Sequence, residues 1–447
     1  MTGTSVRTGR RVALVARYPD PDPAMPQFIP NLGVYMVAAA LRAAGLDGLE
    51  LRLWDLRGGT ADALADQIAA WDPDIVGFSA YLWSFPLFFD AARRLKQNDP
   101  GRLIVFGGPS ARPAMLRLPP FRDAAHIDLL VTGEGETVMP QIVRTPRRDR
   151  ESLARIGGVA VPTAKGWLDT PKPPPAVLND LASPYVQGMV PPGGLGVLQT
   201  YRGCPFTCSF CEWGVMEAPK NVRSADNLSA EFLAMAAMGL GGALLVDAGL
   251  NLNRPAFENL SRAAAETGFF RNRALITEVY PAKVQPRHLE FLAGVGQPYI
   301  GVGLQSFDNL TLANVERSYD EARFDATLAD LDAVGDLAVE IILGLPGDSP
   351  EGFLRSFERA RRLPAALRVY HCVVLPSALM VRSPPEHALE FDPLSLKLRA
   401  CLGWSEKDLR QTAERVTLEA EAAGGQTGEF FWVFPPPGRP RSKRPAA

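Results

Sequence analysis

Short apolar runs alternate with helical patterns along the first 145 residues. Runs of consecutive apolar residues predict buried strands, and apolar positions three or four apart predict helices. The predicted strands are Val12–Ala16, Leu49–Trp54, Ile75–Ser79, Leu103–Phe106 and Leu129–Thr132, and the predicted helices are Leu32–Ala44, Ala61–Trp71 and Pro86–Gln97. This alternation predicts a doubly wound, Rossmann-like parallel sheet, which binds ligands at the carboxyl ends of its strands.

The same alternation resumes at Gly196. The predicted strands are Gly196–Thr200, Ala243–Asp247, Ala274–Val279, Tyr299–Leu304, Val339–Leu343 and Val369–Leu375. Helical patterns separate them at Ser224–Met238, Pro255–Thr267, Tyr319–Val334 and Pro350–Arg361. Six strands with intervening helices predict a partial (β/α)6 barrel, so the chain as a whole belongs to the α/β class.

Prolines and charged residues mark the boundary between these two regions. Residues 146–195 form a predicted linker, with prolines at 171, 173, 174, 175, 184, 191 and 192. The predicted domains are therefore residues 1–145 and 196–394, followed by a short C-terminal extension at 395–447. Four aromatic residues of this extension are expected to serve packing more than substrate contact: Phe430, Phe431, Trp432 and Phe434.

Composition narrows the class of protein. A chain of 447 residues is too long for one hydrophobic core and predicts two or more domains. Because 47% of the residues are hydrophobic, folded domains are favoured over disorder. The formal net charge of -2 gives no reason to expect a nucleic-acid partner. No apolar run reaches the length of a membrane span or a signal peptide. Five cysteines in a chain of this length form no disulfide framework, and we expect a reducing, cytoplasmic location.

Three of the five cysteines lie within eight residues, at Cys204, Cys208 and Cys211, with the spacing C-x3-C-x2-C. Three thiolates on one loop suit a [4Fe–4S] cluster that leaves one iron open. An open iron can chelate the amino and carboxylate groups of S-adenosylmethionine. The alternative is a zinc knuckle, which needs a fourth ligand such as Cys372.

The sequence around and after these cysteines resembles the radical S-adenosylmethionine superfamily. Residues 211–214 read Cys-Glu-Trp-Gly, similar to the Cys-Asp-Trp-Gly of one large group. Residues 301–306 resemble the family's GxGxQS segment, which is followed here by Arg317, and residues 342–348 match its LIxGLPGxT segment. The last strand resembles a VLPG segment, although Ser377 replaces the glycine. The order of these motifs carries the resemblance.

The resemblance implies roles for individual residues. Phe210 is expected near the adenine, and Asp247 at the strand end near the methionine amino group. Glu278 is expected to contact the ribose or methionine of S-adenosylmethionine or to reach the open iron, and it is the candidate catalytic residue. An exposed acid at a strand end is the simpler alternative. Gln305 and Ser306 are further candidates for binding S-adenosylmethionine.

The first region resembles the cobalamin-binding module found ahead of many radical S-adenosylmethionine domains. The matching segments are 76–79, 106–109 and 133–136. Glycines at strand ends let the backbone approach a flat macrocycle or its nucleotide tail. The implied cobalamin contacts are Ser79, which would bond the dimethylbenzimidazole, and Gly107, Gly108, Gly133, Glu134 and Gly135. Ordinary strand-to-helix glycines are the alternative.

One departure from that module concerns the lower face of cobalt. Many such modules carry a DxHxxG loop after the first strand, but residues 17–23 read Arg-Tyr-Pro-Asp-Pro-Asp-Pro. The four histidines, at 126, 288, 371 and 387, all lie elsewhere. The aromatic residues Tyr81, Trp83 and Phe85 are either cover for that face or core. Arg17 is a candidate contact to a cobalamin amide or phosphate.

Together these resemblances imply a cobalamin-dependent radical S-adenosylmethionine methyltransferase. Its substrate would be a small molecule from natural-product or cell-envelope metabolism, methylated on carbon. An external donor such as flavodoxin or ferredoxin would supply electrons. An oxidative cyclase or ring-rearranging enzyme with the same two domains stays open, as does a first domain that is empty and serves docking. A non-enzymatic iron–sulfur redox sensor is the third alternative.

Overall fold

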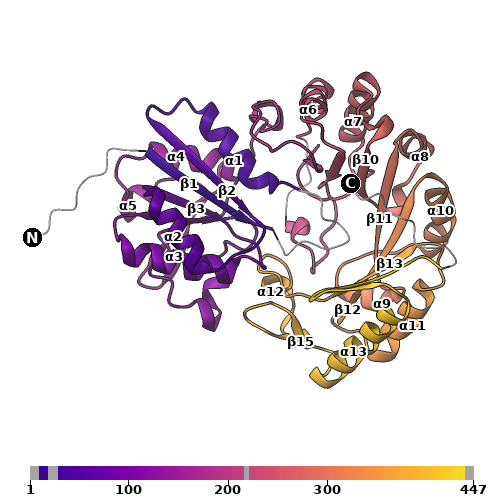
Figure 1. The fold of residues 1–447 in the computed structure, drawn as a ribbon. Coiled ribbons are helices and arrows are strands. Elements are labelled where there is room, and N and C mark those ends of the chain that lie inside the picture. Colours follow the sequence, from indigo (N-terminus) through magenta and orange to yellow (C-terminus); the bar gives the residue numbers. More distant parts are fainter. Residues whose placement is uncertain (1–9, 19–28, 216–220, 438–447) are drawn as a thin grey trace, which may run out of the picture. The chain divides into compact units, whose positions relative to one another are not determined.

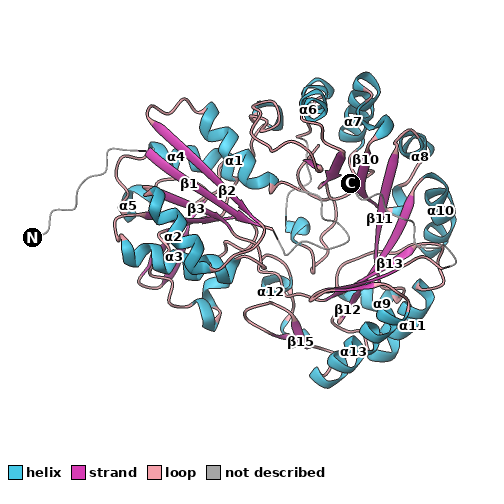
Figure 2. Cartoon of the chain, viewed as in Figure 1, coloured by secondary structure: helices cyan, strands magenta, loops and turns pink. Residues whose placement is uncertain are grey.

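The computed structural model describes residues 10–18, 29–215 and 221–437. The chain divides into two compact units, Met1–Pro192 and Gly193–Ala447. Both units are α/β, as predicted, and their helices and strands alternate along the chain (Figures 1 and 2). No helix in the described ranges combines the length and apolarity needed to cross a membrane.

The first unit is built on a seven-stranded sheet in the order β2-β1-β3-β4-β5-β6-β7. The five parallel strands are β1 (Arg10–Arg17), β2 (Leu49–Leu56), β3 (Ile75–Ser79), β4 (Leu103–Gly107) and β5 (Leu129–Val131). The helices of this unit are α1 (Leu32–Ala43), α2 (Ala61–Trp71), α3 (Phe85–Asn98), α4 (Gly135–Arg144) and α5 (Arg150–Leu153). The strand order reverses between β1 and β3, which makes the carboxyl ends of these two strands the expected ligand site.

Two strands of this sheet come from the segment predicted as a linker. They are β6 (Val159–Thr163) and β7 (Gly166–Asp169), and β6 pairs antiparallel with β5. Val159, Ala160 and Val161 are fully buried, so this segment gives apolar cover to a strand that would otherwise be an exposed edge.

The second unit contains six adjacent parallel strands, in the order predicted from the sequence. They are β8 (Gly196–Leu198), β9 (Gly242–Leu245), β10 (Ala274–Val279), β11 (Gln297–Gln305), β12 (Asp336–Leu343) and β13 (Ala366–His371). Figure 1 shows the helices along the outer side of this curved sheet. They are α6 (Ala225–Ala237), α7 (Arg254–Thr267), α8 (Pro286–Ala293), α9 (Asn309–Asn314), α10 (Glu321–Val334) and α11 (Pro350–Ala360).

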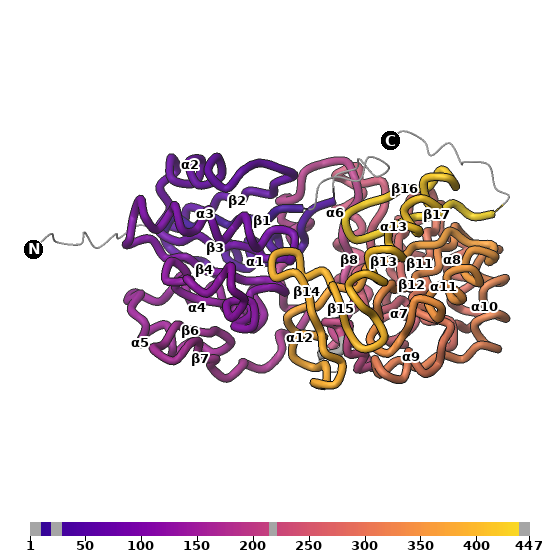
Figure 3. The backbone as a smooth tube through the Cα atoms, turned by 90° about the horizontal axis from the view of Figure 1, so that it is seen from below, coloured from indigo at the N-terminus to yellow at the C-terminus, as the bar shows by residue number. Residues whose placement is uncertain are grey.

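The C-terminal residues complete this unit. A four-residue helix, α12 (Leu379–Arg382), follows β13, and the small hairpin β14 (Glu390–Phe391) and β15 (Leu398–Ala400) precedes α13 (Glu406–Ala422). The last strands, β16 (Gln426–Thr427) and β17 (Phe431–Phe434), lie beside α13, and β17 pairs antiparallel with β13 (Figure 3). Trp432 and Phe434 are buried, which confirms the predicted packing role of these two aromatic residues.

Local sequence explains where three helices of the second unit begin. Asn253 and Ser349 precede α7 and α11, and each side chain accepts a hydrogen bond from a backbone N–H in the first turn. Ser405 and Asp408 form a reciprocal capping box at the start of α13. These contacts satisfy amides that have no partner within the helix, typically contributing about 1 kcal/mol each.

Candidate functional site

The cysteine loop leaves the carboxyl end of β8 and is anchored there by Asp247. The Asp247 carboxylate, at the end of β9, accepts hydrogen bonds from the backbone N–H of Thr200 (2.8 Å) and Tyr201 (3.3 Å) and from the Thr200 hydroxyl. Burial raises the pKa of Asp247 to about 7, although the bonds from Thr200 oppose the shift. Asp247 was expected to line the site near the methionine amino group; its observed contacts anchor the loop, and its role in cofactor binding stays a prediction.

The loop itself is held by backbone bonds and by one stacked pair. The Cys211 N–H donates to the Cys208 carbonyl (3.1 Å), and the Ser209 N–H donates to Val315 (3.0 Å). Phe206 stacks on Tyr280, with ring centroids 4.6 Å apart. Cys208 is buried, while Cys204 and Cys211 are partly exposed. The loop therefore has a defined backbone and two accessible thiols.

Within the described residues, no three His, Cys, Asp or Glu side chains are grouped closely enough to hold a metal ion. The assignment of Cys204, Cys208 and Cys211 as ligands therefore stays a prediction. Its support is chemical, because the donors are three thiols on one ordered loop at the carboxyl ends of parallel strands. Phe210 is half-buried on the same loop.

Arg317 reaches the cysteine loop from the segment after α9. Its guanidinium lies 3.8 Å from the Cys208 sulfur, donates to the Gly303 carbonyl and covers the Tyr280 ring at 5.5 Å. Burial raises the pKa of the Cys204 thiol, and the positive charge of Arg317 opposes part of that shift. The sequence placed Arg317 in a motif without giving it a role, and the structure brings it to the cysteines.

Arg382 is a functional candidate that the sequence did not reveal. Its guanidinium donates to the carbonyls of Thr207 (3.1 Å), Cys208 (2.9 Å), Ser209 (3.2 Å) and Cys211. The same C-terminal segment makes a second contact, from the Ser377 N–H to the Glu212 carboxylate (3.1 Å). This contact uses the backbone, so it does not require the glycine that Ser377 replaces.

Glu278 ends β10 on the polar inner face of the sheet. Its carboxylate occupies the space above Gly301, where an added Cβ would lie 2.0 Å from Oε1. Burial and the nearby Glu340 carboxylate raise the pKa of Glu278 well above its usual value, while Arg368 and Arg317 oppose the shift. No described residue donates a hydrogen bond to this carboxylate.

Glu340 on β12 is already engaged. It accepts hydrogen bonds from the Arg368 guanidinium (3.1 Å) and the Tyr370 hydroxyl (3.4 Å), both on β13. The Arg368 guanidinium bonds Glu340 and therefore only partly offsets the raised pKa of Glu278. The raised pKa favours the protonated form of the Glu278 carboxyl group.

Gln305 and Ser306 follow each other but differ in their surroundings. Gln305 has a positive φ of 78° at an irregularity in the β11–β12 pairing, a strained conformation that is frequent at functional sites. Its side-chain nitrogen lies over Gly303, on the same side as Arg317. Ser306 is buried, contacts the Ser356 hydroxyl (3.3 Å) and accepts from the Asp308 N–H (3.0 Å). The predicted role of Ser306 in binding stays untested, and its contacts serve the fold.

In the first unit, the predicted Ser79, Gly107 and Gly108 meet at the carboxyl ends of β3 and β4. Ser79 pairs in register with Ala16 of β1 and Gly107 of β4, which places it where the strand order reverses. Gly108 has a φ of +91°, and a Cβ there would lie 2.7 Å from the Ala80 carbonyl. Glycine is therefore required at position 108 by the fold itself.

The segment Gly133–Glu136 also has close contacts within its own unit. A Cβ on Gly135 would lie 2.8 Å from Val37 of α1, and Gly133 donates its N–H to Gly158 (2.8 Å). The Glu134 carboxylate accepts from the Ala176 N–H (2.6 Å). These contacts explain by folding alone why Gly133, Glu134 and Gly135 occupy their positions. Their predicted contacts with cobalamin stay predictions.

The three aromatic residues after β3 divide into core and surface. Phe85 is fully buried against Phe89, Phe106 and Phe121, so it belongs to the core. Tyr81 and Trp83 are partly exposed and stack with centroids 4.6 Å apart. The Trp83 indole N–H donates to the Arg17 carbonyl at the end of β1 (2.8 Å). The rest of the proline-rich loop, from residue 19, lies outside the described residues.

His126, the histidine of the first unit, does not lie at this edge. It precedes β5 at the amino end of that strand and is buried against Phe89. Burial lowers its pKa to about 4, so it is neutral at physiological pH.

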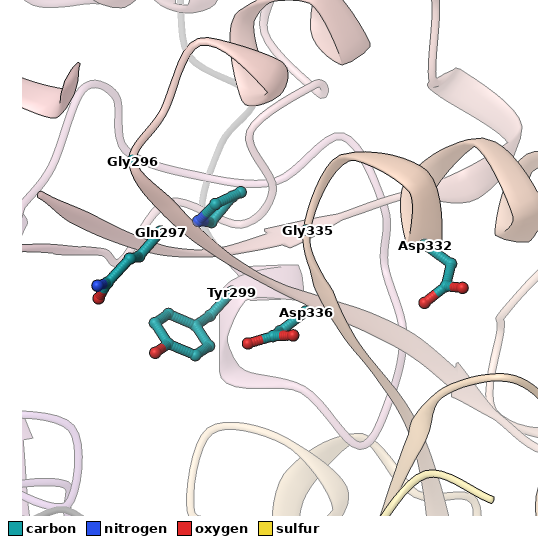
Figure 4. Close-up of a pocket in the computed structure, with 7 residues that line it drawn as sticks. Gly296, Gln297, Tyr299, Asp332, Gly335 and Asp336 are labelled. Carbon is teal, nitrogen blue, oxygen red and sulfur yellow. The ribbon is translucent and has the colours of Figure 1, made fainter. Parts of the chain in front are cut away.

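A pocket in the second unit lies at the opposite edge of the sheet from the cysteine loop. Figure 4 shows its lining, which includes Gln297 and Tyr299 at the start of β11 and Asp336 at the start of β12. Ligands of barrels built from parallel strands bind at the carboxyl ends of the strands. We therefore do not include this pocket in the site.

Comparison with known families matches both units. Residues 24–143 match the B12 binding domain, and residues 198–360 match the radical SAM superfamily. The chain thus carries a B12-binding domain followed by a radical SAM domain, which confirms the order predicted from the motifs.

Two relatives carry similar sequence over part of the chain. A 2-(S-pantetheinyl)-carbapenam-3-carboxylate methyltransferase of Streptantibioticus cattleyicolor is 30% identical over 48% of this chain and 32% of its own length. The cobalamin-dependent radical SAM methyltransferase TokK of Streptomyces tokunonensis is 32% identical over 34% of this chain and 23% of its own length. The matched regions thus span a third or less of either relative.

A solved structure has the same fold. The radical S-adenosylmethionine methyltransferase TsrM from Kitasatospora setae, with cobalamin and a [4Fe–4S] cluster bound, superimposes with a TM-score of 0.65 at 18% identity. The similarity covers 87% of this chain and 81% of TsrM. At this identity the likeness concerns the fold.

Proposed function

We propose that this protein is a cobalamin-dependent radical S-adenosylmethionine methyltransferase that methylates a carbon atom of a small molecule. One observation carries the proposal: an ordered three-cysteine loop lies at the carboxyl ends of six parallel strands, in a chain that also holds a B12-binding domain. When bound, the cluster supplies an electron to S-adenosylmethionine and cobalamin supplies a carrier for its methyl group.

Residues of the loop and of neighbouring strands would bind the cluster and S-adenosylmethionine. Cys204, Cys208 and Cys211 would hold three irons. Gln305 and Arg317, which meet over Gly303, would bind the methionine carboxylate of S-adenosylmethionine at the fourth iron. Phe210 would lie against the adenine. Asp247 would position the loop through Thr200.

Glu278 would act as a hydrogen-bond donor. Its raised pKa favours the protonated carboxyl group, and a neutral acid is a weaker iron ligand than a carboxylate. We therefore favour a contact from Glu278 to the ribose or methionine of S-adenosylmethionine over coordination of the open iron.

Cobalamin would bind at the carboxyl edge of the first sheet. Ser79 lies at the strand reversal, and the stacked Tyr81–Trp83 pair beside the end of β1 offers a flat, partly exposed aromatic surface. We propose that this pair, without a histidine, covers the face of the corrin below cobalt. The glycines at 107 and 108 would let the backbone approach the cofactor.

The partners follow from the chemistry. One-electron reduction of the cluster needs an external donor, for which flavodoxin or ferredoxin is the expected class. The net charge of -2 supports a small-molecule substrate over a nucleic acid. The free cysteines support a reducing, cytoplasmic location.

The test uses S-adenosylmethionine carrying a labelled methyl group. Anaerobically reconstituted protein, with cobalamin and a reductant, is incubated with extract from a host that lacks the gene. We expect label in a small-molecule product, and none when cobalamin is omitted or when Cys208→Ala protein is used. Label that enters the product without cobalamin, or no labelled product with fully loaded protein, would refute the proposal.

A further inference from the structure

One side chain binds the backbone of the second half of the cysteine loop. Arg382 lies at the end of α12, after the last parallel strand, and donates to four carbonyls between Thr207 and Cys211. Two of these carbonyls belong to Cys208 and Cys211, both predicted ligands. Only arginine has a planar fork of five N–H donors, so neither lysine nor glutamine can reproduce this set of bonds.

The charge of Arg382 is also unusual in its surroundings. Among the described residues, no carboxylate forms an ion pair with this guanidinium, and its buried Nε has no hydrogen-bond partner. The side chain is partly exposed, and its guanidinium lies at the carbonyls of two predicted cluster ligands. Three thiolates and the cluster they hold would place an anion beside this positive charge.

We propose that Arg382 is the positioning residue of the iron–sulfur cluster: its fork fixes the cysteine loop, and its charge stabilises the reduced cluster. The inference rests on the proposed function, because it requires a cluster on these cysteines. It assigns Arg382 two separable effects, one geometric and one electrostatic. Positive charge beside a cluster raises its reduction potential, since reduction adds negative charge.

Three variants separate the two effects in the full-length protein. Arg382→Gln removes both the fork and the charge, and Arg382→Lys keeps the charge but loses the fork. Arg399→Gln is the matched control, because Arg399 is exposed and bonds Glu406. After anaerobic reconstitution, we measure cluster loss to an iron chelator and the reduction midpoint by an EPR-monitored titration.

We expect both Arg382 variants to lose iron about 10- to 100-fold faster than wild type, the usual cost of removing a residue that supports metal ligands. The midpoint should become more negative in Arg382→Gln and stay near the wild-type value in Arg382→Lys. Far-ultraviolet circular dichroism of the cluster-free proteins shows whether each variant folds. If Arg382→Gln does not fold, the rate at which Arg382→Lys loses iron tests the geometric part of the inference.

Loss rates and midpoints equal to those of Arg399→Gln would overturn the inference while leaving the proposed function intact. An equal negative shift in both Arg382 variants would overturn the electrostatic part, because the charge is kept in one of them. Wild-type and Arg399→Gln proteins that take up no cluster would overturn the proposed function and the inference with it.

Discussion

At the scale of single residues, two side chains near the cysteines bind the backbone of the loop. Asp247 holds the start of the loop through Thr200 and Tyr201, and Arg382 holds its end through backbone carbonyls. Arg317 is different, since its guanidinium reaches the Cys208 sulfur. Residues that position the loop are thus distinct from those that face its thiols.

The pH dependence of stability tests the position of Asp247. Its pKa is about 7 in the folded protein and about 3.9 in an unfolded chain, so the folded state binds this proton more tightly. Wild-type stability should therefore fall as pH rises from about 4 to about 7, by up to about 1.4 kcal/mol per pH unit.

Asp247→Asn has no proton to lose at this site. Melting temperatures of the two proteins, compared from pH 5 to 8, should diverge in favour of the variant as pH rises. Parallel curves would show that Asp247 does not titrate in this range. The comparison cancels the other titrating groups, which are the same in both proteins.

At the scale of elements, glycines in β11 make room for the polar groups of the inner face. Gly301 lies beneath the Glu278 carboxylate, and Gly303 lies beneath the Gln305 amide. Their neighbours in register, on β10 and β12, bring Glu278 and Glu340 beside this strand. A strand with alternate glycines thus places two carboxylates next to the region of the cysteine loop.

Gly301→Ala tests this arrangement. The new methyl group would collide with the Glu278 carboxylate and displace it, at a small cost in unfolding free energy because the carboxylate is the end of a flexible side chain. We expect methyl transfer to fall while the iron content stays close to wild type. Gly241→Ala is the control, because its nearest atom, the Gly194 carbonyl, is 3.6 Å away. Equal activity in the two variants would remove Glu278 from the proposed mechanism.

At the scale of the whole molecule, both domains could be predicted from the sequence because the patterns that indicate them are local. Apolar runs predicted the parallel strands, and the spacing of Cys204, Cys208 and Cys211 predicted the loop. Arg382 could not be predicted, because 171 residues separate it from Cys211 and only the tertiary fold brings them together. The glycines at 133 and 135 were readable as a motif, but their contacts with Gly158 and Val37 depend on packing.

The central claim is that one chain carries both cofactors, each on its own domain. Metal analysis of the reconstituted full-length protein tests it most directly. We expect about four iron atoms and one cobalt per chain. Cys208→Ala should lose the iron and keep the cobalt, since cobalamin binds elsewhere in the chain. Wild-type protein that takes up iron but no cobalt, or a Cys208→Ala variant that keeps its iron, would contradict the account.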